Sequence, residues 1–145
     1  MMTNAAAPRE LSITRLIEAS PETVWQIWSG RTGEWWAPRP YTTPIVAFDL
    51  RAGGRAFCEM RAPDGTPMPN EGVFLEVVPA RRVVFTDAFG PGWVPHGPFM
   101  VAIIEFADEG GRTRYTARVA PSCFHSAYGG LETPKAPRGE LALSL

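Results

Sequence analysis

Residues 17–36 read IEASPETVWQIWSGRTGEWW, and they decide the fold because they predict two short helices directly after a strand. Ser20 is a typical helix N-cap, and Pro21 suits the first position of a helix. Gly30 ends the first helix, and residues 32–36 (TGEWW) predict a second, shorter helical turn. Spacing of i, i+3 and i+4 gives the first helix one apolar face, made of Val24, Ile27 and Trp28.

The residues on either side of this stretch predict strands. LSITRLI at 11–17 alternates apolar and polar residues, as a half-buried strand does. The other predicted strands, joined mainly by hairpin turns, are residues 43–50, 55–61, 71–78, 81–88, 99–106 and 112–119. Strands joined by hairpins form an antiparallel sheet, so the sequence predicts an α+β fold with a strongly curved sheet. Its concave face must be covered by something else.

Polar residues indicate which face of each strand is exposed. Glu59, Glu76 and Glu105 interrupt apolar strands and are expected to face outward. Alternation then places the opposite side chains on the inner face: Ala56, Cys58, Met60, Val73, Leu75, Val77, Ala102, Ile104 and Phe106.

Size and charge exclude several classes of protein. A chain of 145 residues is expected to form one domain, and its net charge of −1 gives no reason to expect nucleic acid or an anionic membrane as a partner. No apolar run approaches the roughly 18 residues of a membrane-spanning helix, and no signal peptide is apparent at the start. We therefore expect a cytoplasmic protein whose two cysteines, Cys58 and Cys123, are reduced.

The order of these segments resembles the START-like (SRPBCC) superfamily, in the branch named after the activator of the ninety-kilodalton heat-shock-protein ATPase. The resemblance covers residues 11–120 and rests on five segments: IEASPETVWQIWSG, EWWAP, DLRAGGRAFCEMRAPDG, EGVFLEVVPARRVVFTDAF and TRYTARV. It implies a helix-grip fold, in which an antiparallel sheet wraps round a long C-terminal helix and leaves a hydrophobic cavity between them. Residues 1–10 would be a flexible tail.

Residues 121–145 depart from the family pattern. Where the long helix would run, the chain has Gly129, Gly130, Pro134, Pro137 and Gly139. An interior proline costs a helix about 3 kcal/mol and a glycine about 1 kcal/mol, so a continuous helix is not expected here. Three explanations are open. The first is a truncated or frameshifted end of the chain, which is the explanation we favour. Otherwise the segment forms a short irregular lid, or a partner chain covers the sheet, as in a homodimer.

The sequence predicts no catalytic residues, metal or cofactor. His96 and His125 lack neighbours at metal-ligand spacing, and neither a phosphate-binding loop nor a Gly-x-Ser-x-Gly motif occurs. Cys58 is expected to be a small buried hydrophobe and not a nucleophile.

We expect the cavity to bind a small hydrophobic molecule. Its predicted lining is Met60, Leu75, Phe85, Ile104 and Tyr115, with Trp35 or Trp36 at its mouth. For the two adjacent tryptophans, a purely structural role at the end of the sheet is the favoured interpretation. Two alternatives are kept: an enzyme of the cyclase or hydratase type that uses Tyr115 and His96, and a regulatory domain that interacts with a chaperone.

Overall fold

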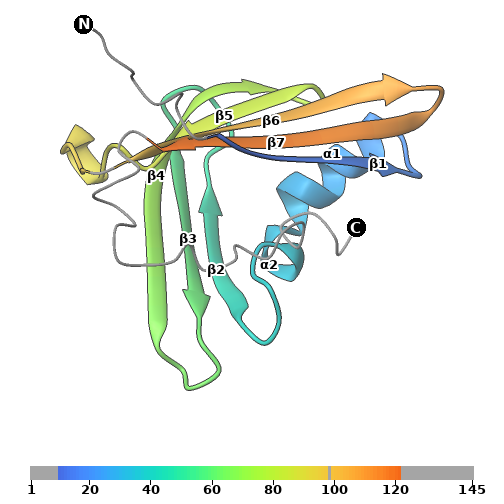
Figure 1. Cartoon of the computed structure of the whole chain (residues 1–145). Coiled ribbons are helices and arrows are strands. Elements are labelled where there is room, and N and C mark those ends of the chain that lie inside the picture. Colours follow the sequence, from blue (N-terminus) through green and yellow to red (C-terminus); the bar gives the residue numbers. More distant parts are fainter. Residues whose placement is uncertain (1–9, 98, 122–145) are drawn as a thin grey trace, which may run out of the picture.

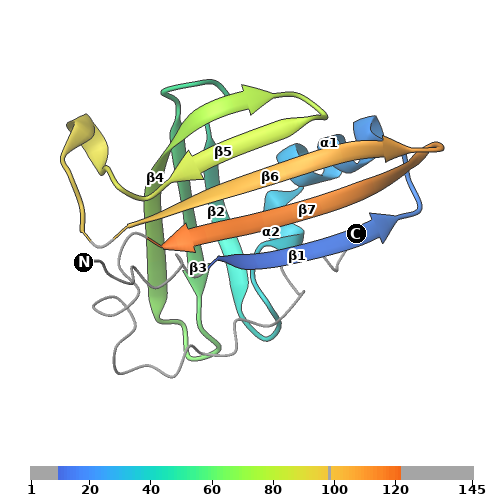
Figure 2. The same cartoon turned by 45° about the horizontal axis from the view of Figure 1, so that its top comes forward.

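The computed structural model describes residues 10–97 and 99–121 and contains one curled antiparallel sheet with two short helices on its inner side (Figures 1 and 2). The strand order is β1-β7-β6-β5-β4-β3-β2. The helices are α1 (Pro21–Gly30) and α2 (Thr32–Trp35), and a single 3₁₀ turn spans Pro91–Trp93. The strands are β1 (Leu11–Ile17), β2 (Thr42–Phe48), β3 (Arg55–Arg61), β4 (Pro67–Val78), β5 (Arg82–Thr86), β6 (Met100–Glu109) and β7 (Arg112–Pro121). The predicted fold class is confirmed.

Helix α1 begins and ends where its sequence predicts. The Ser20 hydroxyl accepts a hydrogen bond from the backbone N–H of Thr23 at 3.2 Å, which caps the helix, and Pro21 occupies the first turn. Val24 and Trp28 are buried against the sheet, with Ile27 packed beside them. None of the helices in the described residues is long and apolar enough to cross a membrane.

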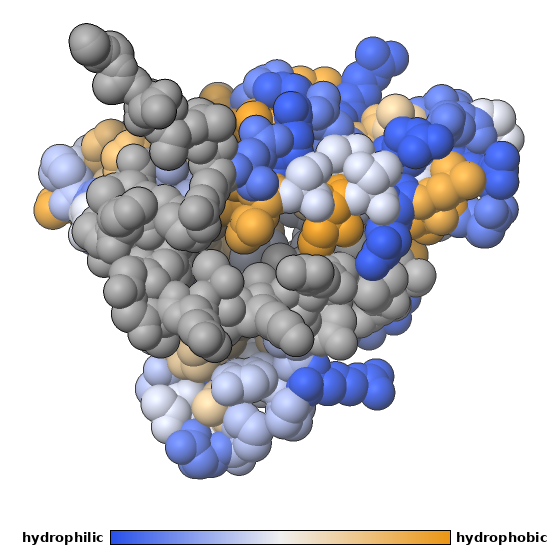
Figure 3. All heavy atoms as spheres, in the orientation of Figure 1, coloured by the Kyte–Doolittle hydropathy of each residue, from blue (hydrophilic) through white to orange (hydrophobic). Residues whose placement is uncertain are grey.

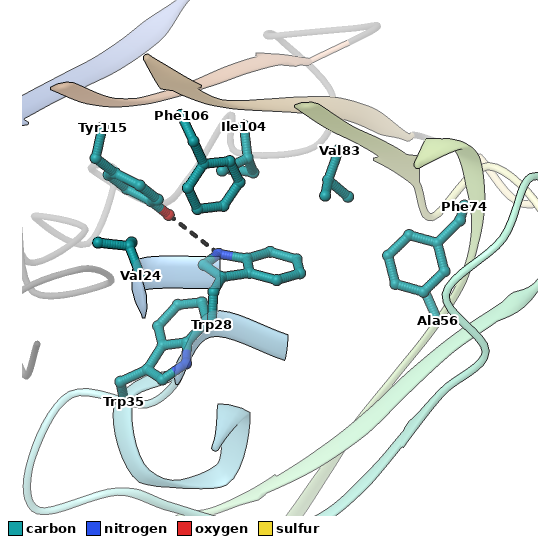
Figure 4. Packing of buried hydrophobic residues seen from close by; sticks show 9 residues of the cluster. All are labelled: Val24, Trp28, Trp35, Ala56, Phe74, Val83, Ile104, Phe106 and Tyr115. Carbon is teal, nitrogen blue, oxygen red and sulfur yellow. Dashed lines mark hydrogen bonds between the residues drawn. The ribbon is translucent and has the colours of Figure 1, made fainter. Parts of the chain in front are cut away.

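Aromatic side chains form most of the core, with Trp28 at its centre (Figure 4). The Trp28 indole stacks on Trp25 with ring centroids 5.9 Å apart, and it contacts Trp35 at 5.6 Å and Phe106 at 6.2 Å. Such pairs contribute roughly 0.5–1.5 kcal/mol each beyond the apolar area that they bury. These contacts link α1 to β6 through Phe106 and link α2 to α1 through Trp35.

A β-bulge in β4 changes which side chains face inward. Phe74 pairs with Phe85 but Glu76 pairs with Val84, so Leu75 is an extra residue without an opposite partner. Phe74 is buried in the core, whereas Leu75 is 45 % exposed. The predicted inward orientation of Leu75 is therefore wrong. Before the bulge the inner face carries even-numbered residues, so Val73, which was also predicted inward, lies on the opposite face from Phe74.

The first half of β4 was not predicted as a strand, because Pro67 and Pro69 interrupt it. This half, up to Gly72, pairs only with β3, since β5 begins its pairing at Val73. Its other edge pairs with no strand of the described residues, and an unpaired edge tolerates a proline because no hydrogen bond is lost there. The sheet splits at this point into two arms, which appear at a steep angle to each other in Figure 1.

The other predicted faces are confirmed. Ala56 and Cys58 of β3, and Ala102, Ile104 and Phe106 of β6, are buried. On the outer face, Glu105 accepts hydrogen bonds from Arg82 at 3.1 Å and Arg118 at 2.7 Å. On the side of the molecule shown in Figure 3, hydrophobic residues form small separate areas among hydrophilic ones. The expectations for residues 122–145, including Cys123 and His125, lie outside the described residues.

Candidate functional site

A cavity of about 70 Å³ lies on the concave face, where the two arms of the sheet meet beside the end of α2. Four aromatic rings form its apolar wall: Trp36, which follows α2, Phe48 of β2, Phe74 of β4 and Phe85 of β5. The remaining lining consists of Ala56, Cys58, Asn70, Glu71, Gly72, Thr86, Asp87 and Met100.

The four rings contact one another in a closed cycle. Trp36 lies 5.9 Å from Phe48 and 6.0 Å from Phe85, measured between ring centroids. Phe74 completes the cycle, at 5.3 Å from Phe48 and 6.1 Å from Phe85. Three of these four pairs are edge-to-face, the arrangement that the ring quadrupole favours. The four rings therefore form one continuous apolar wall.

The two adjacent tryptophans have different positions. Trp35 is only 2 % exposed and packs in the core against Trp28. Trp36 is half-buried and lines the cavity. A helical turn places successive residues about 100° apart, so neighbouring side chains point in different directions. Trp35 thus belongs to the core, while Trp36 is part of the cavity wall.

Of the other residues that the sequence proposed for the cavity, the structure places Phe85 in the lining. Ile104 and Tyr115 are buried in the core beside the helices (Figure 4), and Met60 lies half-buried on β3 beyond the lining. Leu75 is on the bulge. Sequence reasoning missed Phe48 and Phe74. It also missed the polar side chains of the lining, which we call the polar rim: Asn70, Glu71, Thr86 and Asp87. The available signal was that Phe48 and Phe74 are aromatic residues in two predicted strands. The bulge, however, reversed the expected face of Phe74.

Three groups were considered from the sequence as a possible nucleophile, acid or base: Cys58, Tyr115 and His96. Burial raises the pKa of the Cys58 thiol to about 11, so it stays protonated and behaves as a small hydrophobe. Burial also raises the pKa of the Tyr115 hydroxyl to about 12, and this hydroxyl accepts a hydrogen bond from the Trp28 indole at 3.2 Å. His96 is exposed on the loop after β5. Within the described residues no cluster of three potential metal ligands occurs.

The polar rim is fixed by hydrogen bonds to the backbone and to Arg55. Asp87 Oδ1 accepts from the backbone N–H of Met100 at 2.8 Å, and the Thr86 hydroxyl donates to the carbonyl of Met100 at 2.6 Å. Glu71 accepts three hydrogen bonds of 2.6–3.0 Å from the Arg55 guanidinium. Each rim side chain is thus held in one position.

The sequence and the fold of this chain are similar to those of one family of known proteins. The family model described as activator of Hsp90 ATPase homolog 1-like protein matches residues 18–136. A crystal structure from Nitrosomonas europaea is 32 % identical, with a TM-score of 0.74, and the match covers 79 % of this chain and 76 % of the other. A solution structure of an AHSA1-like protein from Aeromonas hydrophila is 26 % identical, with a TM-score of 0.63, and covers 77 % and 74 %.

More distant structures share the fold over a larger part of the chain. A crystal structure from Mycobacterium smegmatis is 23 % identical, with a TM-score of 0.74, and the match covers 93 % of this chain and 86 % of the other. No curated protein sequence matches significantly.

Proposed function

Since the chain belongs to the family of activator of Hsp90 ATPase homolog 1-like proteins, we propose that it uses the concave face of the START-like fold to bind a small hydrophobic molecule. The observation that carries this proposal is the wall of four mutually contacting rings, Trp36, Phe48, Phe74 and Phe85, that lines the cavity. Binding sites for small molecules are mostly apolar hollows with a few fixed polar groups, which is the composition found here.

Apolar burial alone would supply the affinity. At about 25 cal/mol per Å² of apolar surface, burying one phenyl ring against this wall gives a few kcal/mol, which corresponds to millimolar binding. Larger natural ligands that extend beyond the described lining would bind more tightly. The position of Tyr115 in the core, with its hydroxyl bonded to Trp28, favours binding over cyclase or hydratase chemistry as the role of the cavity.

A titration of the isotope-labelled full-length protein with 2-phenylethanol, followed by NMR, tests the proposal. This neutral probe carries one phenyl ring, which can pack against the aromatic wall. We expect saturable shifts at lining residues such as Ala56, Cys58 and Phe85. Shifts that are scattered over the surface, or that do not saturate, would overturn the proposal.

Two tryptophan variants give a matched comparison. Trp36→Ala removes one side of the wall, so the affinity for 2-phenylethanol should fall on the order of tenfold, the effect of losing about 1.4 kcal/mol. Trp93→Ala removes an indole that is 59 % exposed and lies outside this lining, so it should leave the affinity unchanged. Equal losses in both variants would contradict a site at Trp36.

A further inference from the structure

The charged side chains that line the cavity, within the described residues, are both acids. Glu71 is already neutralised, because the Arg55 guanidinium binds both of its carboxylate oxygens. Asp87 differs, since no arginine or lysine in the described part of the chain forms an ion pair with it. The rim of the apolar cavity therefore carries one negative charge that lacks a counter-charge from these residues.

The Asp87 carboxylate is held rigidly at this place. Its Oδ1 accepts a hydrogen bond of 2.8 Å from the backbone N–H of Met100, which is also a lining residue. Asp87 is half-buried and directly follows Thr86, the last residue of β5 that pairs with β6. A carboxylate has about four lone-pair sites, and one N–H donor uses only one of them. The carboxylate therefore has the capacity to accept a further hydrogen bond from a ligand.

The other polar side chains of the rim add few free donors. The Thr86 hydroxyl hydrogen is used by the Met100 carbonyl, and its oxygen accepts from the backbone N–H of Ala88 at 3.1 Å. The amide nitrogen of Asn70 donates to the Met68 carbonyl at 3.1 Å. The described rim thus offers mainly acceptors and negative charge to a molecule in the cavity.

We infer that the ligand carries a hydrogen-bond donor or a positive charge beside its apolar body, which pairs with Asp87, and that a ligand with a carboxylate at this position is rejected. This inference rests on the proposed function and specifies its ligand class. A cationic ligand supplies the missing counter-charge. An anionic ligand is repelled by the Asp87 carboxylate, and because the site is partly buried, water screens this repulsion less than in bulk solution.

Three probes that share a phenyl ring and a two-carbon chain, and that differ in the charge at the end of the chain, test the inference. They are 2-phenylethylamine, which is cationic at neutral pH, neutral 2-phenylethanol and anionic phenylacetate. Titrated into the full-length protein and followed at the lining residues by NMR, they should bind in the order amine, alcohol, carboxylate. We expect the amine to bind at least about tenfold more tightly than the carboxylate, and this ratio to shrink with added sodium chloride.

Asp87→Asn isolates the charge, because the asparagine oxygen can still accept from the Met100 N–H. In this variant the ratio of amine to carboxylate affinity should fall to about threefold or less. Asp64→Asn is the matched control: Asp64 also accepts a backbone N–H, from Thr66 at 2.9 Å, but it lies in an exposed turn away from the cavity. It should leave all three affinities unchanged.

The outcomes separate this inference from the proposed function. If the three probes bind at the lining residues without regard to charge, or if Asp87→Asn leaves their order unchanged, the inferred ligand class is wrong while the binding function stands. If none of the probes perturbs the lining residues, the proposed function fails and the inference fails with it.

Discussion

The indole Nε1 of Trp28 donates a hydrogen bond of 3.2 Å to the hydroxyl of Tyr115, and this bond joins α1 to β7 inside the core (Figure 4). The two residues are 87 positions apart in the chain, and neither is more than 2 % exposed. A buried pair of this kind fixes the orientation of the helix on the sheet, because each partner satisfies a polar group that water cannot reach.

Tyr115→Phe should therefore reduce stability and leave ligand binding unchanged. The ring volume is kept, but the Trp28 N–H loses its acceptor, which costs about 1–3 kcal/mol. Urea unfolding measures this loss, with Tyr41→Phe as a control because Tyr41 is exposed. Normal stability together with weaker binding of 2-phenylethanol would show instead that the Tyr115 hydroxyl serves the ligand.

Cys58 should make stability depend on pH in the alkaline range. The unfolded thiol ionises near its ordinary pKa of 9.0, whereas burial raises the pKa of the folded thiol to about 11. The folded protein then binds the thiol proton more strongly than the unfolded chain does. The contribution of Cys58 to the free energy of unfolding is therefore complete below pH 9, and it is lost as the pH rises through 11. The loss is on the order of 2 kcal/mol.

Comparison with Cys58→Ala separates this effect from other groups that titrate at high pH. Urea unfolding measures the free energy of unfolding at about pH 8 and about pH 10.5. Between these two values it should decrease less in the variant than in the wild type. Equal decreases in the two proteins would contradict the assignment to Cys58.

Local signals in the sequence were enough to predict most of the elements. Ser20 and Pro21 define the start of α1, and the spacing of Val24 and Trp28 identifies its buried face. The residues of β1 and β3 were predicted with the observed bounds, because their alternation is regular and turns flank them. These properties depend on neighbours in the chain, so they can be recognised without knowing the fold.

The cavity could be predicted only in part, since its lining depends on how distant strands meet. Phe85 was proposed for the lining from its strand position, and Trp36 was one of two tryptophans proposed for the mouth after the second helical turn; the structure has both residues in the lining. Phe74 was missed because a single extra residue at Leu75 reverses the inward and outward faces of β4. Nothing in the local pattern EGVFLEVV distinguishes a regular strand from one with this bulge, which is set by pairing with β5.

Gly72→Ala should destabilise the sheet at the junction of its two arms. A Cβ atom at this position would collide with the carbonyl oxygen of Thr86, a backbone atom that cannot rotate away. We expect a loss of about 1–3 kcal/mol in urea unfolding, the usual cost of overpacking. Gly30→Ala is the control, because a Cβ there meets no atom within 4 Å beyond its chain neighbours and the backbone of its own helix. If both variants were equally stable, the close approach of β4 to Thr86 would be refuted.

The bulge in β4 predicts losses of stability of very different size for two adjacent apolar residues. Phe74→Ala removes a ring that is 1 % exposed and contacts both Phe48 and Phe85, so it should cost about 3–5 kcal/mol. Leu75→Ala shortens a side chain that is 45 % exposed, and it should cost less than about 1 kcal/mol. Urea denaturation of the two variants measures both values. A regular strand in which Leu75 faced the core would reverse their order, so a larger loss for Leu75→Ala would rule out the bulge at this position.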